Sequence, residues 1–200
     1  MFSIKDAIKY GWNKSKEHME LVLFSTFLVL AVASLKFSVL WFIGIIFLII
    51  LKIGYTKLFL RMYDGENPKL AEIFQEYKTF WRYLGASILF PIVVLLGLIL
   101  IIIPGFIWAV RFSFSTLIVI DTKTGPIASM KESYAITKGN FWHLFLFWIA
   151  IIGINLLGAI LLGIGLLVSI PVSTFAIIYV YRALSKARAA ITETASPQSA

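Results

Sequence analysis

The stretch IIIPGFIWAVRFSF, residues 101–114, places one arginine, Arg111, inside an almost unbroken apolar run. An arginine at the centre of a bilayer costs roughly 2.5–3.5 kcal/mol on insertion scales, so such a residue usually faces a helix bundle or a cavity. The same stretch contains Pro104 and Gly105, a pair that favours turns. Whether this segment crosses a membrane, and what Arg111 contacts, therefore decides both the fold and the candidate site.

The composition of the chain is that of a membrane protein. Of its 200 residues, 60% are hydrophobic and only 14% are charged, and the mean hydropathy is +0.92. A soluble domain of this size would expose far too much apolar surface at these values. We therefore expect a multi-pass protein of the cell (plasma) membrane, with a single domain over residues 1–190. Residues 191–200 are polar at their end, TETASPQSA, and are expected to form a disordered tail.

Charge and residue types exclude several classes of function. The formal net charge is +8, but the basic residues flank apolar blocks, where they orient membrane helices, so we expect no nucleic-acid partner. The chain has no cysteine, which excludes disulfides and cysteine-bound metals. Its two histidines, His18 and His143, have no partners at ligand spacing. We therefore expect no metal site and no cofactor.

Three long apolar blocks set the expected fold. They cover residues 21–51, 83–120 and 141–181, and each is too long for one membrane span and suited to two. This pattern predicts an all-α integral membrane protein with six transmembrane helices arranged as three hairpins. Two outer turns stay open at this point: Gly97 or Pro104 in the second hairpin, and Gly158 or Gly163 in the third.

The distribution of basic residues predicts the orientation. Fifteen of the 18 lysines and arginines precede the first hairpin, separate consecutive hairpins or follow the last one. Because positive charge gathers on the cytoplasmic side of membrane proteins, both termini are expected to be cytoplasmic.

Each hairpin is preceded by a segment with the pattern of an amphipathic surface helix. Ser3 and Asp6 have capping-box form before the first. Asn67-Pro68 is a typical start of the second, and the third runs from Pro126 toward Gly139. We expect these helices to lie in the headgroup layer. The alternative is that they pack on one another as a small cytoplasmic cap.

The three units also suggest an internal repeat with a spacing of about 61 residues. Phe80-Trp81 aligns with Phe141-Trp142, and a Leu-Leu-Gly triplet ending at Gly97 aligns with one ending at Gly158. The predicted repeat boundaries are 1–61, 62–122 and 123–184. Each unit would be a surface helix followed by a hairpin, all in the same orientation, as in parallel repeats of transporters.

Arg111 is the first candidate site residue, because no aspartate or glutamate lies inside a predicted span. Its available partners are Asn155, backbone carbonyls, Asp121 at the end of the same helix, or a lipid phosphate. The alternative is a structural explanation, in which the long side chain extends to the membrane surface and merely sets the depth of the helix.

Lys52 joins Arg111 in a predicted anion site. In the register of the repeat, Lys52 lies within a turn of the depth of Arg111, and two cations without a carboxylate between them would suit an anionic lipid headgroup. Trp108 and Ser115 share the helical face of Arg111. The predicted site for an anionic lipid or anion therefore comprises Arg111, Lys52, Trp108, Ser115 and Asn155.

From residue 61 to residue 184 the chain resembles a known group of proteins. The residues that carry the resemblance are Gly65-Glu66, Pro104-Gly105, Arg111, Asp121, Gly125-Pro126, Lys131-Glu132-Ser133, Thr137-Lys138-Gly139 and Phe141-Trp142. This group is the membrane domain of bacterial glycerophosphodiester phosphodiesterases, with related uncharacterised stand-alone polytopic membrane proteins. In that family the chemistry belongs to a separate soluble barrel of about 250 residues, more than this whole chain. The resemblance therefore implies a membrane module near glycerolipids and no enzymatic activity.

The expected function is binding rather than catalysis. The sequence has no phosphate-loop pattern and no HExxH, and Lys123-Thr124-Gly125 is interpreted as a turn. We expect a non-enzymatic integral membrane protein that is lipid-associated or organises a partner at the inner leaflet. Its partners would be membrane lipids with anionic headgroups, another membrane protein or a second copy of the chain. The alternative is a small transporter or lipid translocator with Arg111 in its pathway.

Overall fold

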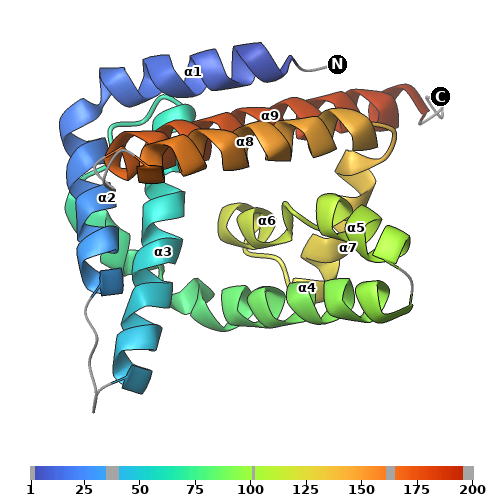
Figure 1. Cartoon of the computed structure of the whole chain (residues 1–200), viewed down its shortest axis with the longest axis horizontal. Helices are drawn as coiled ribbons and strands as arrows, with labels where there is room; N and C mark the ends of the chain where they lie inside the picture. Colours follow the sequence, from blue (N-terminus) through green and yellow to red (C-terminus); the bar gives the residue numbers. More distant parts are fainter. Residues whose placement is uncertain (1–2, 35–40, 101, 161–164, 196–200) are drawn as a thin grey trace, which may run out of the picture.

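The structure, a computed structural model, describes residues 3–34, 41–100, 102–160 and 165–195, and every regular element in these ranges is a helix (Figure 1). This confirms the all-α class. The elements in chain order are α1 (Ile4–Glu17), α2 (Met19–Ser34), α3 (Trp41–Tyr63), the 3₁₀ helix η1 (Leu70–Thr79), α4 (Phe80–Leu100), α5 (Ile102–Arg111), α6 (Ser115–Thr122), α7 (Pro126–Thr137), α8 (Phe141–Ile160) and α9 (Leu166–Ala195).

Four segments of the described chain are long and apolar enough to cross a membrane. They are Phe80–Gly97, Gly105–Thr122, Phe141–Ile160 and Leu166–Ala190, and a shorter apolar helix covers Met19–Leu30. Large apolar side chains are exposed along α8, which suits contact with lipid tails. The chain therefore has the properties of a membrane protein. The count of six spans and the cytoplasmic placement of both termini stay predictions.

The helices form pairs that do not share one direction (Figure 1). Helices α8 and α9 run antiparallel across the view, and the α2–α3 pair stands at a steep angle to them. Helix α4 runs across the view in the direction opposite to α8, whereas the predicted repeat gives these two helices the same orientation. The repeat boundaries at 1–61, 62–122 and 123–184 stay predictions of the sequence. The helices that the repeat would superimpose, α4 and α8, do not run in the same direction in the structure.

The first predicted surface helix packs along α9 instead of facing only headgroups. Its predicted cap is confirmed, because the Asp6 N–H donates to Ser3 Oγ at 3.4 Å. The buried face of α1 consists of Ala7, Gly11 and Ser15, and a Cβ at Gly11 would overlap the backbone of α9 at Val172. Small residues let two helix backbones approach closely, which explains this contact, and the placement of α1 in the headgroup layer stays a prediction.

The second and third predicted helices also exist, with different geometry. Helix η1 follows Asn67-Pro68 as a 3₁₀ helix and packs so tightly on α3 that a Cβ at Gly54 would overlap the Ile73 carbonyl. Helix α7 begins at Pro126, as predicted. Its buried face includes Ser129, Ser133 and Thr137, whereas Ile127 of the expected apolar stripe is 65% exposed.

The turn between α4 and α5 falls between its predicted alternatives, and the turn between α8 and α9 does not fall at Gly158. Helix α4 ends at Leu100 and α5 begins at Ile102, so Gly97 and Pro104 are both helical. Gly97 instead packs against Gly105 of the neighbouring helix, because a Cβ on Gly97 would lie 2.8 Å from the Gly105 Cα. Helix α8 likewise continues beyond Gly158 to Ile160, and Gly163 lies outside the described residues.

The predicted start of the tail, residue 191, lies before the end of the last helix. Helix α9 continues to Ala195, so residues 191–195 extend a helix instead of starting a disordered segment. Residues 196–200 lie outside the described part of the chain.

Candidate functional site

Arg111 lies at a break in the helical backbone. Helix α5 ends at Arg111 and α6 begins at Ser115, so the apolar run quoted above is not one continuous helix. The turn between them is held by its own hydrogen bonds. Ser113 Oγ donates to the Val110 carbonyl at 2.8 Å, and the Ser115 N–H donates to the Phe112 carbonyl at 3.0 Å.

Two hydroxyls of α7 satisfy the backbone groups that this break leaves open. Ser133 Oγ donates to the Arg111 carbonyl at 2.8 Å and accepts from the Phe114 N–H at 3.2 Å. Thr137 Oγ1 lies 3.3 Å from the same carbonyl, and it shares its one proton between this acceptor and the carbonyls of Ser133 and Tyr134, at 2.8 and 3.1 Å. Both hydroxyl side chains are buried. Because a buried helix end needs partners for its carbonyls, these two residues make the break stable.

The guanidinium of Arg111 is stabilised by its local surroundings. Its carbon Cζ lies 4.5 Å from the ring centroid of Tyr134, a cation–π contact. Arg111 is also the last residue of α5, so its positive charge interacts favourably with the negative end of the helix dipole. Nη1 is buried and has no hydrogen-bond partner among the described residues. Neither Asp121 nor Asn155 is its partner.

Asn155 instead joins α8 to α9. Its Nδ2 donates to Ser173 Oγ at 2.8 Å and to the Ile151 carbonyl at 2.9 Å, and its Oδ1 accepts from Ser169 Oγ at 3.0 Å. Asparagine at this position therefore acts as a polar clasp within the last hairpin.

The five predicted site residues are not brought together. Trp108 packs against Gly97 in the α4–α5 hairpin, where its ring would lie 2.8 Å from an added Cβ. Ser115 is buried, and its hydroxyl has no partner in the described part of the chain. Arg111, Lys52 and Asn155 lie on three different helix pairs, so the structure separates the predicted site into local contacts.

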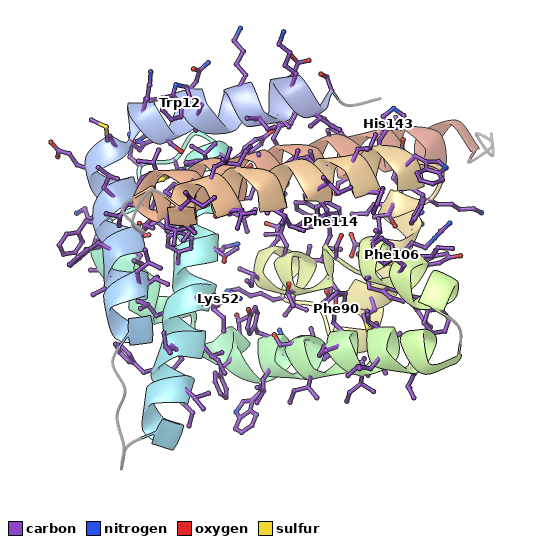
Figure 2. All side chains as sticks on the ribbon, in the orientation of Figure 1. Trp12, Lys52, Phe90, Phe106, Phe114 and His143 are labelled. Atoms are coloured by element: carbon purple, nitrogen blue, oxygen red, sulfur yellow. The ribbon has the colours of Figure 1, made fainter. Side chains whose placement is uncertain are left out.

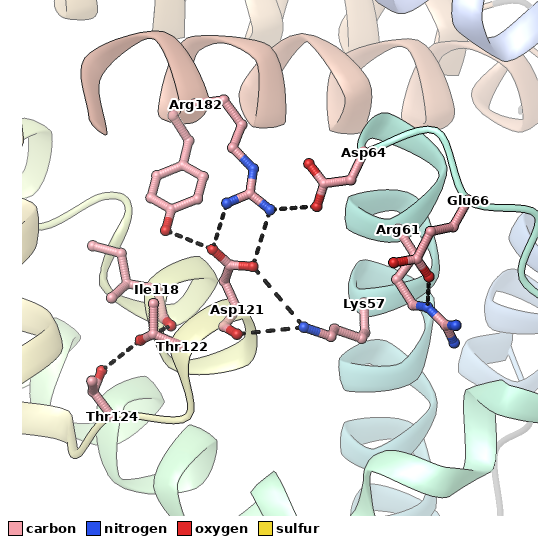
Figure 3. A network of polar contacts seen from close by, with 10 residues as sticks. Lys57, Arg61, Asp64, Glu66, Ile118, Asp121, Thr122, Thr124 and Arg182 are labelled. Carbon is pink, nitrogen blue, oxygen red and sulfur yellow. Dashed lines mark hydrogen bonds and ion pairs between the residues drawn. The ribbon is translucent and has the colours of Figure 1, made fainter. Parts of the chain in front are cut away.

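A polar cluster that the sequence analysis missed lies around Asp121 (Figure 3). The Asp121 carboxylate, of which only 12% is exposed, accepts from the Tyr181 hydroxyl at 2.9 Å. It also accepts from Arg182 Nη1 at 2.8 Å and Nη2 at 3.2 Å. Lys57 Nζ lies 4.0 Å from it, and Arg182 Nη2 donates to Asp64 at 2.6 Å. We call these five residues the Asp121 cluster.

The Asp121 cluster ties together three helices that are distant in sequence, α3, α6 and α9. Each of its charges has an opposite charge as a partner, so the cluster is suited to holding helices in place rather than to binding a further ion. At its margin Arg61 pairs with Glu66 at 2.5 Å and with Glu72. A sequence signal was lacking, because the partners of Asp121 lie about 60 residues away in both directions.

Lys52 has the opposite surroundings. It lies on α3 about 7.5 Å before Lys57 along the helix axis and extends toward the centre of the molecule (Figure 2). Two cavities, of about 620 and 270 Å³, share the wall formed by Lys52, Thr56, Tyr83 and Thr174. No carboxylate lines either cavity, and no described residue forms a hydrogen bond or ion pair with the Lys52 ammonium.

This arrangement combines an ammonium that has no partner among the described residues with a phenol hydroxyl, that of Tyr83, at an apolar boundary. A charge in such surroundings favours a counter-charge, because the low dielectric strengthens the attraction. The Tyr83 hydroxyl can donate to an oxygen of an anionic group beside the ammonium, whereas the hydroxyls of Thr56 and Thr174 already donate to the carbonyls of Lys52 and Ile170, each at 2.9 Å. Of the two predicted cations, Lys52 is the one that lines these cavities.

Comparisons with known proteins lead to uncharacterised relatives. Residues 92–188 match the model of a family described as "Protein of unknown function (DUF975)". The uncharacterized protein Rv2560 of Mycobacterium tuberculosis is 30% identical over 151 residues, which cover 68% of this chain and 46% of that protein. The uncharacterized protein Mb2590 of Mycobacterium bovis is 29% identical over 151 residues, which again cover 68% of this chain and 46% of that protein.

The chain thus spans less than half the length of the curated relatives it matches. No solved structure matches the chain at a significant level. The printed names of these relatives do not mention a phosphodiesterase, so the resemblance to that membrane domain stays a prediction. Over residues 92–188 the chain is similar to a family whose function is unknown, and the function has to be argued from the site.

Proposed function

We propose that this chain is a non-enzymatic integral membrane protein that binds an anionic phospholipid, with the Lys52 ammonium as the contact for the phosphate. The observation that carries the proposal is the unpaired Lys52 ammonium at the wall shared by two cavities whose linings contain no carboxylate. A phospholipid is the occupant that fits, because it supplies a phosphate for the cation and acyl chains for the apolar walls.

The strength expected of this contact follows from its chemistry. A hydrogen bond to a charged group contributes about 1.5–3 kcal/mol, and a phosphate between Lys52 and Tyr83 would receive one from the ammonium and one from the phenol hydroxyl. Of the two cations in the site predicted from the sequence, Lys52 and Arg111, the proposal keeps only Lys52. Arg111 already has a helix terminus and an aromatic ring as partners, whereas Lys52 has neither.

The test measures the lipid that remains bound to the detergent-purified protein. Native mass spectrometry compares the wild type with Lys52→Met and with Lys186→Met, a matched control that removes the same charge from an exposed position on α9. We expect Lys52→Met to weaken retention of anionic phospholipid about tenfold or more, corresponding to at least about 1.4 kcal/mol. The Lys186→Met protein should retain lipid as the wild type does.

A second arm separates a lipid from a free anion. Millimolar inorganic phosphate should not displace the bound lipid, because it cannot occupy the apolar walls. Equal retention by Lys52→Met and the wild type, or full displacement by inorganic phosphate, would contradict the proposal.

The alternative function, a small transporter or lipid translocator with Arg111 in its pathway, has less support. Arg111 does not line either cavity at Lys52, nor the apolar groove between α4, α5 and α8. The lipid-binding proposal, in contrast, rests on the surroundings of Lys52 and requires no pathway through the protein.

A further inference from the structure

We infer that the lipid bound at Lys52 has two acyl chains and that the protein holds them in two separate apolar cavities, one on each side of the headgroup. The inference rests on the proposed function and adds the class of lipid. It is carried by three cavities that share walls, and by the way in which polar side chains are distributed among them.

The first chain would occupy the larger cavity, of about 620 Å³, between α2, α3, α4 and α9. Its lining includes the aliphatic residues Val29 and Leu30 of α2, and Ile45, Leu48 and Ile49 of α3, beside the hydroxyl-bearing residues Thr26, Tyr55 and Ser87. Its volume lies within the range of about 300–1,000 Å³ that is usual for ligand pockets.

The second chain would occupy an apolar groove of about 360 Å³ between α4, α5 and α8. None of the described residues that line this groove is charged. The rings of Phe106 and Phe145 meet edge to face in its wall, with centroids 5.4 Å apart. Ile152 at its margin is 64% exposed, so the groove opens toward the apolar outer surface of α8.

The smaller cavity of about 270 Å³ connects the other two through shared walls. It shares Lys52 and three hydroxyl-bearing residues with the larger cavity, and it shares Ser113 and Trp148 with the groove. Trp148 Nε1 donates to Ser113 Oγ at 3.2 Å, which places a polar pair where the groove begins. The Lys52 ammonium thus lies in the middle, with a mainly apolar cavity on one side and an apolar groove on the other.

Two chains fit this division better than one. A single-chain amphiphile with its phosphate at Lys52 would fill one apolar cavity and leave the other without an occupant, and apolar cavities hold water poorly. A second chain on the same headgroup enters the other cavity as an intramolecular step, which raises its effective concentration. We therefore expect a diacyl anionic phospholipid to bind more tightly than its single-chain lyso form.

The test compares a diacyl anionic phospholipid with its lyso form on three proteins. Ala109→Trp fills the groove, because Ala109 lines it, and Ala159→Trp is the matched control on the exposed side of α8. Affinities are measured by native mass spectrometry of the full chain in detergent. We expect Ala109→Trp to weaken diacyl binding at least about tenfold and to change lyso binding by less than about twofold, with Ala159→Trp changing neither.

A second groove variant keeps the inference testable should Ala109→Trp fail to fold. Ile152→Trp fills the groove from its exposed margin and should show the same selective loss. Unchanged diacyl binding in these variants, or an equal loss of both lipids, overturns the two-chain inference while Lys52-dependent binding stands. Loss of the dependence on Lys52 itself would instead overturn the proposed function.

Discussion

The Asp121 cluster and the cavity wall at Lys52 lie on the same helix, α3, and treat their lysines in opposite ways. Lys57 belongs to a set of charges in which Asp121 and Asp64 balance it and Arg182. Lys52, five residues earlier, faces hydroxyls and apolar side chains without a carboxylate. The charge of Lys57 is therefore neutralised within the protein, whereas the charge of Lys52 has no partner among the described residues.

The difference teaches which charges belong to the fold and which are available to a ligand. Removing one partner from a buried ion pair is costly, since the other charge stays behind without compensation. Removing an unpaired charge from a cavity wall leaves nothing uncompensated. Stability and lipid retention should therefore respond to mutations of these two regions in opposite patterns.

The largest effect is expected for Asp121→Ala. The substitution leaves Arg182 and Lys57 without their common partner, and the Tyr181 hydroxyl without its acceptor. We expect a loss of about 3 kcal/mol in the free energy of unfolding, the lower end of the range for broken buried pairs, because Arg182 keeps some exposure. Thermal or denaturant unfolding in detergent measures it, and an unchanged midpoint would show that the cluster does not hold the three helices.

An intermediate effect is expected for Ser133→Ala. This change leaves the Phe114 N–H, a buried donor, without its acceptor and removes one of two hydroxyls from the Arg111 carbonyl. We expect a loss of about 1–2 kcal/mol, with lipid retention at Lys52 unchanged. Ser3→Ala serves as a control at an exposed cap, and a smaller loss for Ser133→Ala than for Ser3→Ala would contradict the assigned role.

A small effect on stability is expected for Lys52→Met, the opposite end of the comparison. In lipid-free detergent the free energy of unfolding should change by less than about 0.5 kcal/mol, because no partner is left behind. The same unfolding measurement, repeated with anionic phospholipid added, should stabilise the wild type more than the variant. A large loss of stability without lipid would mean that Lys52 has a structural partner after all.

The smallest effect concerns Tyr10, at the edge of the Asp121 cluster. Its ring packs between those of Tyr63 and Tyr179, at 5.2 and 5.1 Å, and desolvation, followed by the influence of Tyr63, raises the pKa of Tyr10 to about 12. The protonated form is favoured in the folded state. Its contribution to the docking of α1 is therefore complete below a pH of about 10, the ordinary pKa of tyrosine, and is lost as pH rises through the folded pKa.

Phenolate absorbance during a titration measures this step. Tyr10→Phe should remove one phenol from the titration near pH 12 and preserve the ring contacts. A phenol at position 10 that titrates near its ordinary pKa would contradict the packing of α1 described above.

Local features of the fold were predictable from the sequence. The cap at Ser3 and the helix start at Pro126 depend on neighbouring residues, and both are confirmed. The apolar blocks indicated helices correctly, because hydrophobic length needs no tertiary information. The end of α5 at Arg111 was not predictable, since the hydroxyls that make it stable, Ser133 and Thr137, lie more than 20 residues away.

The candidate site was predicted in part for the same reason. Lys52 and Arg111 look alike in sequence, as cations inside apolar runs. Only the tertiary contacts tell them apart, because Tyr134 is placed beside one and a cavity beside the other. The pairing of Asp121 with Arg182 likewise depends on how α6 and α9 meet.

The contact between α1 and α9 has a consequence for the order in which the molecule is made. Gly11 and Val172 are separated by about 160 residues, which a ribosome adds in roughly 8–30 s at 5–20 residues per second. During synthesis the first helix therefore waits for its partner while every other helix emerges. The contact between α1 and α9 is therefore among the last parts of the protein to form. A nascent chain stalled before Val172 would still expose the small-residue face of α1, which consists of Ala7, Gly11 and Ser15.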